Sequence, residues 1–129
     1  MQSQTSSIPK IFILDDDKDI VSSLTTLFES ENCYVASATN AHKLTERLDK
    51  FKPDLLLIDV VLKVDNGNKI SQELKAHSSY RHIPIILMLA IYDFHHQTSS
   101  NPIFADDYID KPFSNSEIVE KVLALMRED

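Results

Sequence analysis

The sequence predicts an alternating α/β fold: an open, doubly wound sheet of five parallel strands in the order 2-1-3-4-5, with helices on both faces. Short apolar runs recur along the chain, and helical patterns lie between them with connections of a few residues. Carboxylates follow the first and third of these runs directly. Together these observations favour a βα unit repeated five times.

Five runs predict strands, with patterns of different strength. Three are continuously apolar, as in strands buried on both faces. The weaker run at 34–38 predicts an edge strand, and the last run is short because Lys111 and Pro112 end it. In chain order the five are IFIL at 11–14, YVASA at 34–38, LLLI at 55–58, IILML at 85–89 and DYI at 107–109.

Four stretches with apolar residues at helical spacing predict helices that bury one face. Pro53 ends the second, and Ser114 with Glu117 has the spacing of a capping box before the last. The four are 18–31, 41–51, 68–77 and the helix that begins at Ser114. Residues 92–104 hold the place of a further helix, which turn-forming residues in their second half predict to be short or distorted.

The totals of the chain fit a single globular domain. Its 129 residues and 43% hydrophobic content fill one core. We expect a short disordered lead at 1–9 and one domain at 10–129.

The net charge of −7 argues against a nucleic-acid-binding surface. One cysteine, Cys33, and the lack of a signal peptide or a membrane-length apolar run predict the cytoplasm as location.

Glycine is almost missing from the chain. Gly67 is the only one, where ordinary usage gives roughly nine. A glycine kept in such a sequence is expected to serve a need of the backbone, and the usual need is a position with φ > 0. The sequence therefore predicts a left-handed conformation at Gly67.

Acidic residues follow two strands that the predicted order makes neighbours. Asp15, Asp16 and Asp17 follow the first strand, and Asp59 ends the third. Carboxylates that converge in this way need a counter-charge, and Mg²⁺ prefers oxygen ligands of this kind. Lys111, beyond the fifth run, adds a second positive charge. The sequence thus predicts a magnesium site that Asp59 completes.

A simpler interpretation applies to each aspartate taken alone, because an aspartate after a strand is most often a helix N-cap. We expect Asp17 to be one. The joint pattern favours the metal site, since three strand ends carry compatible chemistry in the right order. Asp54 precedes the third strand at the far end of the sheet, and no role is expected for it.

With these residues in view, the chain resembles a stand-alone response-regulator receiver domain, of flavodoxin-like fold, over roughly residues 10–127. IFILDDDKDI resembles the first strand of that family with its acidic pair. PDLLLIDVVLKVDNG resembles the strand and loop of the phosphoacceptor aspartate, with a turn glycine eight residues on. DDYIDKPF resembles the fifth-strand motif with its lysine and proline.

The resemblance implies roles for the acidic residues. Asp59 would accept a phosphoryl group from a histidine kinase or a histidine phosphotransfer protein. Asp16 would bind Mg²⁺ directly and Asp15 mainly through water. Asp59 and the backbone carbonyl of Val61 would complete the ligands from the protein.

Further residues take roles from the same resemblance. Lys111 would pair with Asp59 and later with a phosphoryl oxygen, which the backbone N–H groups of Val61 and Ala90 would also contact. Gly67 would be the turn glycine of the family.

The chain departs from the family at the end of the fourth strand. The family has a threonine or serine there, 22 residues before the lysine, and this chain has Leu89. Leucine cannot hydrogen-bond a phosphoryl group, and its bulk opposes the inward rotation of the aromatic residue, here Tyr108. We therefore predict competence for phosphorylation with altered switching. Lys63 replaces a usual proline and Phe104 a usual glycine, which suggests a changed partner surface.

Three functions compete at this point. The first is a phosphoacceptor receiver of a two-component phosphorelay, which catalyses only its own phosphorylation and dephosphorylation and contacts an unknown downstream protein. The second is a receiver-like binding module that acts independently of phosphorylation, with Leu89 as its support. The third, a hydrolase with an aspartate nucleophile, lacks an acid/base carboxylate two residues after Asp59. The resemblance also allows a homodimer.

Overall fold

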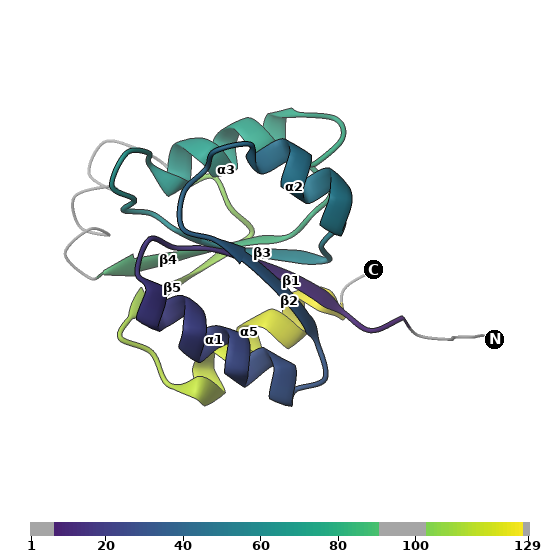
Figure 1. Ribbon diagram of the computed structural model, residues 1–129, viewed down its shortest axis with the longest axis vertical. Coiled ribbons are helices and arrows are strands. Elements are labelled where there is room, and N and C mark those ends of the chain that lie inside the picture. Colours follow the sequence, from purple (N-terminus) through teal and green to yellow (C-terminus); the bar gives the residue numbers. More distant parts are fainter. Residues whose placement is uncertain (1–6, 91–102, 128–129) are drawn as a thin grey trace.

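The computed structural model describes residues 7–90 and 103–127, which form an open parallel sheet between two layers of helices (Figure 1). The strand order is β2-β1-β3-β4-β5, and every neighbouring pair is parallel, so the predicted fold class and strand order are confirmed. In chain order the elements are β1 (Lys10–Leu14), α1 (Lys18–Ser30), β2 (Tyr34–Ala38), α2 (Leu44–Phe51), β3 (Leu55–Asp59), α3 (Gly67–Ala76), β4 (Ile85–Ala90), β5 (Asp107–Lys111) and α5 (Asn115–Met126).

The continuous apolar strands are buried on both faces. In β3, Leu56 and Ile58 belong to the apolar layer that α2 and α3 cover, whereas Leu55 and Leu57 belong to the layer that α1 and α5 cover. Figure 1 shows these helix pairs on opposite sides of the sheet. Each leucine buried in this way stabilises the fold by roughly 1.5–3 kcal/mol relative to an exposed one, which explains the absence of polar alternation.

The predicted edge strand lies at an edge of the sheet, since β2 pairs only with β1. Its side chains are exposed or half-buried except at Ala38, in contrast to the buried residues of β3. The weaker apolar pattern of this strand therefore reflects its position.

Two boundaries differ from the prediction by more than one residue. The helix predicted from residue 41 begins at Leu44, because Asn40 Oδ1 accepts a hydrogen bond from His42 N–H in a turn and Lys43 has φ 54°. The strand predicted at 107–109 continues to Lys111, which pairs with Ala90 of β4. Most of the helix predicted at 92–104 lies in residues 91–102, which are outside the described residues. Most of the predicted lead at 1–9 also lies outside them, because residues 1–6 are not described.

Side-chain caps fix the helices whose first turns border the carboxyl edge of the sheet. Asp17 Oδ1 accepts from the N–H groups of Asp19 and Ile20 at the start of α1, so the predicted N-cap is confirmed. Asn66 caps α3 in the same way. Ser114 and Glu117 form the predicted capping box of α5, with both reciprocal bonds present.

The prediction for Gly67 was wrong, because no glycine has positive φ. The requirement is steric. A Cβ on Gly67 would lie 2.0 Å from the carbonyl oxygen of Asp59, a distance that no side chain reaches. The Gly67 N–H also donates to the Val60 carbonyl at 2.7 Å. Glycine therefore allows α3 to begin in direct contact with the end of β3.

None of the helices in the described part of the chain is long and apolar enough to cross a membrane.

Candidate phosphoacceptor site

The ends of four strands meet at the carboxyl edge of the sheet. Leu14 of β1 is level with Ile58 of β3, so the residues that follow, Asp15 and Asp59, lie beside each other. Across the sheet, Ala90 of β4 is level with Lys111 of β5. The topology thus brings together residues that are up to 96 positions apart in the sequence.

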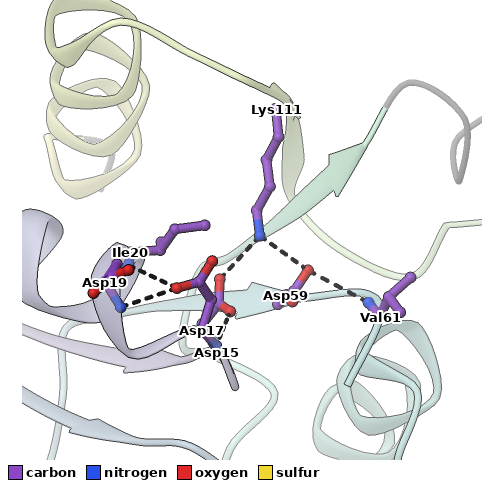
Figure 2. Close-up of polar contacts among 7 residues, drawn as sticks. All are labelled: Asp15, Asp17, Asp19, Ile20, Asp59, Val61 and Lys111. Carbon is purple, nitrogen blue, oxygen red and sulfur yellow. Dashed lines mark hydrogen bonds and ion pairs between the residues drawn. The ribbon is translucent and has the colours of Figure 1, made fainter. Parts of the chain in front are cut away.

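Lys111 reaches between the two carboxylates. Its Nζ lies 3.0 Å from Asp15 Oδ2 and 3.4 Å from Asp59 Oδ1, and Figure 2 shows the ammonium between the two. The side chain of Lys111 is 19% exposed, so the ion pairs are partly shielded from water. Removal of one partner from an ion pair at this depth costs more than at the surface, because it leaves an uncompensated buried charge.

Asp15 is fully buried and its carboxylate is bonded at both oxygens. Oδ2 accepts from Lys111, and Oδ1 accepts from the Asp17 N–H at 2.9 Å. Its own N–H donates to the carbonyl of Ala38 on β2. These contacts hold the carboxylate in one orientation and make it the fixed partner of Lys111.

Asp15, Asp16 and Asp59 form a cluster of carboxylates suited to a hard cation. One oxygen from each lies within 4.8 Å of the others, and Asp16 is half-buried while the other two are buried. Among the described residues this is the only group of three or more acidic, histidine or cysteine side chains so placed. An all-oxygen donor set of this size fits Mg²⁺, which binds few protein carboxylates and keeps waters.

The electrostatics of the cluster favour a positive ligand. Burial, and then the charge of Asp15, raise the pKa of Asp59 to about 7, against the opposing effect of Lys111. Burial acts against the Lys111 ammonium, but the carboxylates of Asp59 and Asp15 outweigh it, and the pKa of Lys111 rises. Near neutral pH one lysine therefore compensates only part of the negative charge of the three carboxylates, and a bound cation would compensate more of it.

The other predicted site residues lie around this cluster. The Val61 N–H donates to Asp59 Oδ1 at 3.4 Å, so it faces the side chain whose phosphoryl oxygens the resemblance expects it to contact (Figure 2). Ala90 ends β4 beside Lys111. Gly67 lies against the backbone of Asp59.

Leu89 and Tyr108 lie in different environments. Leu89 is fully buried in the apolar layer under α2 and α3. Tyr108 is 39% exposed on β5. The predicted effect of this pair on switching stays a prediction.

Comparison with known proteins agrees with this architecture. The chain belongs to the response regulator receiver domain family, whose sequence model matches residues 11–123. It resembles the transcriptional regulatory protein CpxR of Escherichia coli (strain K12), with 33% identity over 118 residues that cover 92% of this chain and 49% of that protein. The chain thus spans about half the length of the curated relatives it matches.

Two solved structures share the fold. A putative response regulator from Chloroflexus aurantiacus J-10-fl has a TM-score of 0.85 and 24% identity, covering 95% of this chain and all of that one. The receiver domain of sensor histidine kinase PA1611 from Pseudomonas aeruginosa PAO1 has a TM-score of 0.81 and 18% identity, covering 95% and 100%. That second structure has a magnesium ion coordinated in its active site cleft.

Sequence reasoning missed two buried polar residues near the site. Asn68 and Ser71 of α3 are buried, and with Asp15 and Asp59 they are the buried polar residues of the described chain. The helical periodicity at 68–77 rests on Ile70 and Leu74 and gives no indication that polar positions of this helix are buried. A spacing of three between Asn68 and Ser71 on a helix with a thin apolar stripe was the available signal.

Proposed function

We propose that this receiver domain is the phosphoacceptor of a two-component phosphorelay and that Asp59 takes the phosphoryl group. The observation that carries the proposal is the placement of Lys111 between Asp15 and Asp59, beside a third carboxylate, Asp16. The donors would be a histidine kinase or a histidine phosphotransfer protein. A cytoplasmic setting is part of the proposal, and the buried free thiol of Cys33 agrees with a reducing compartment.

The chemistry follows from the positions of the side chains. An Asp59 carboxylate oxygen forms the new bond to phosphorus, and the bond from phosphorus to the leaving group breaks with its electron pair on the leaving group. Asp16, Asp59 and the Val61 carbonyl would hold Mg²⁺, and Asp15 would act mainly through water. When bound, Mg²⁺ supplies positive charge to the phosphoryl oxygens.

Lys111 has two tasks in this scheme. Before transfer it compensates Asp59, and after transfer its ammonium is within reach of a phosphoryl oxygen on that residue. The backbone N–H groups of Val61 and Ala90 would supply further donors to those oxygens. Asp15 keeps Lys111 in place throughout, because both of its oxygens already have partners.

A hollow next to Lys111 offers a place for the phosphodonor protein. It encloses about 520 Å³ between α1 and the connection from β5 to α5. Its apolar wall includes Ile20, Leu24 and Phe113, and Lys111 borders it. An amphipathic helix carrying a phosphohistidine suits this shape, since its apolar face would cover the wall while the histidine approaches Asp59.

Incubation with acetyl phosphate and Mg²⁺ tests the proposal. We expect one phosphoryl group per chain, mapped to Asp59 by mass spectrometry of peptides and lost in Asp59→Asn. Asp110→Asn is the matched control, because Asp110 is an exposed carboxylate next to Lys111 and should label like the wild type. A label that persists in Asp59→Asn would exclude Asp59 as the acceptor.

Leu89 favours a second candidate, a binding module that acts through contacts independent of phosphorylation. Its side chain is fully buried among apolar neighbours and offers no hydroxyl to a phosphoryl group. Normal labelling of Asp59 without any change in partner affinity would favour this second function. Turnover of a small phosphoester beyond the rate of self-dephosphorylation would favour a hydrolase instead.

A further inference from the structure

The helix α3 carries a row of polar side chains that the proposed chemistry does not use. Asn68, Ser71 and Lys75 recur at i, i+3 and i+7, so they lie along one side of the helix. Asn68 is 6% exposed and Ser71 is fully buried. We call these three residues the α3 polar stripe.

The α3 polar stripe fastens the chain that leads into β5. The Phe104 N–H donates to Asn68 Oδ1 at 2.8 Å, and the Ser71 hydroxyl donates to the Phe104 carbonyl. Both main-chain polar groups of Phe104 are therefore bound by side chains of α3. Two residues further on, Asp106 pairs with Lys75 at 2.6 Å. Residues 104–106 thus follow α3 in the direction of the helix.

The first turn of the stripe is joined to the phosphoacceptor residue. Gly67, which precedes Asn68, packs its Cα against the carbonyl of Asp59 and donates its N–H to Val60. The cap residue Asn66 also bridges to Val61. Because this contact leaves no space, a shift of the Asp59 backbone moves the first turn of α3 and with it Asn68.

The far end of the stripe is anchored elsewhere. Lys75 Nζ also donates to the carbonyls of Arg81 and Ile83, and Asp106 accepts from the Ile85 N–H. These contacts belong to the amino edge of the sheet, opposite the carboxylate cluster. Lys75 therefore holds the same connection without a link to Asp59, which makes it a control within the stripe.

We propose that Asn68 and Ser71 are positioning residues that couple phosphorylation of Asp59 to the connection at 103–106, in the absence of a hydroxyl at position 89. Leu89 has only apolar atoms in its side chain, whereas the stripe supplies two hydrogen bonds to one backbone segment. The biological meaning of this coupling rests on the proposed function. The contacts themselves are made in the unphosphorylated chain.

The test compares amide resonances of isotope-labelled protein before and after phosphorylation with acetyl phosphate and Mg²⁺. In the wild type we expect the Phe104 and Ala105 amides to shift. In Asn68→Ala and Ser71→Ala the shift is lost, although Asp59 still takes the label. Lys75→Met keeps the shift, so a general loss of stability cannot account for the effect. Hydrogen exchange at the Phe104 amide should accelerate in Asn68→Ala alone, because only that variant removes its acceptor.

Unchanged shifts in Asn68→Ala and Ser71→Ala would overturn the inference, and so would a wild type whose Phe104 and Ala105 amides do not respond. If Asp59 takes no label, the proposed function is refuted, and the coupling is then tested by a second comparison, between wild type and Asp59→Asn. Wild type and Asp59→Asn differ only in the acceptor side chain, and the Phe104 amide must differ between them if the stripe carries the coupling. Equal resonances there would also overturn it.

Discussion

Asp16 and Asp17 are adjacent carboxylates with separate tasks. Asp17 caps the first turn of α1, where its side chain accepts hydrogen bonds from two backbone N–H groups. Asp16 belongs instead to the cluster with Asp15 and Asp59. Charge alone does not distinguish the roles of Asp16 and Asp17, because both residues follow the same strand. Their different surroundings predict different effects of substitution.

Substitution of Asp17 should affect mainly the stability of the fold, and substitution of Asp16 should affect mainly Mg²⁺ affinity. Asp17→Ala should lower the free energy of unfolding by roughly 0.5–2 kcal/mol and leave Mg²⁺ affinity almost unchanged. Asp16→Asn should weaken Mg²⁺ binding at least about tenfold and leave stability in metal-free buffer nearly unchanged or slightly raised. Urea unfolding and calorimetric titration measure the two quantities. Equal loss of Mg²⁺ affinity in both variants would contradict the assignment.

Asp59 makes the metal-free protein less stable as pH rises. Burial and then Asp15 raise its pKa from 3.8 to about 7, so the folded state holds a proton that the unfolded state has released. The stabilisation is complete below the unfolded pKa, falls between about pH 4 and about pH 7, and is gone above that range. Relative to Asp59→Asn, the wild type should lose roughly 1–3 kcal/mol over this interval, after allowance for water at the outer carboxylate oxygen.

Urea unfolding of both proteins in a chelating buffer, at several pH values, checks this difference. Mg²⁺ should reduce it above neutral pH, because the ion binds the deprotonated carboxylate. A difference between wild type and Asp59→Asn that stays constant with pH would mean that Asp59 is ionised throughout.

At the scale of elements, much of the architecture could be predicted, and each exception has an identifiable cause. The buried strands follow from runs such as Leu55–Ile58, since a strand covered on both faces needs no polar alternation. The late start of α2 depends on the conformation of Lys43, which no apolar pattern encodes. The α3 polar stripe was not predicted, because Asn68 and Ser71 contact Phe104, a residue 33 positions beyond Ser71 in the sequence.

The site residues were predictable for a different reason. Asp59 and Lys111 end strands, and the order of strands alone decides that such ends meet. The need for Gly67 was foreseen but its cause was not, because close contact between α3 and the Asp59 carbonyl is a property of packing. Sequence patterns report periodicity, and they carry no information on contacts between distant backbones.

The junction of β3 and α3 gives a prediction at this scale. Gly67→Ala should lower the free energy of unfolding by about 1–3 kcal/mol or more, because its Cβ meets backbone atoms that cannot turn aside. It should also slow labelling of Asp59, since the same backbone carries the acceptor. Gln72→Ala, at an exposed position of the same helix, should be nearly neutral. Wild-type stability and labelling in Gly67→Ala would show that the contact can relax.

At the scale of the whole molecule, the described residues form one sheet between two helix layers, and a signal from Asp59 has to pass through packed side chains. Leu89 is fully buried in the layer under α2 and α3, and Tyr108 lies 39% exposed on β5. A response through these two residues requires Leu89 to move against its packed neighbours. The connection at 103–106 is tied to Asp59 through α3 and is expected to respond instead.

Substitution at position 89 tests this view. Leu89→Thr should lower the free energy of unfolding by roughly 2–5 kcal/mol and should create a shift of the Tyr108 amide on phosphorylation. Leu89→Val is the matched control, because it removes similar volume without adding a hydroxyl. It should lose less stability and gain no response at Tyr108. A Tyr108 response already present in the wild type would contradict the prediction of altered switching.

The central claim is that the carboxylates of Asp15, Asp16 and Asp59 form one cation-dependent acceptor site faced by Lys111. The most direct measurement is the rate of Asp59 labelling by acetyl phosphate as a function of Mg²⁺ concentration, in wild type and Asp16→Asn. We predict a rate that is negligible in chelator, saturates with Mg²⁺ in the wild type, and needs far more Mg²⁺ in Asp16→Asn. Labelling that proceeds equally well in chelator, or that requires the same Mg²⁺ concentration in both proteins, would contradict the account.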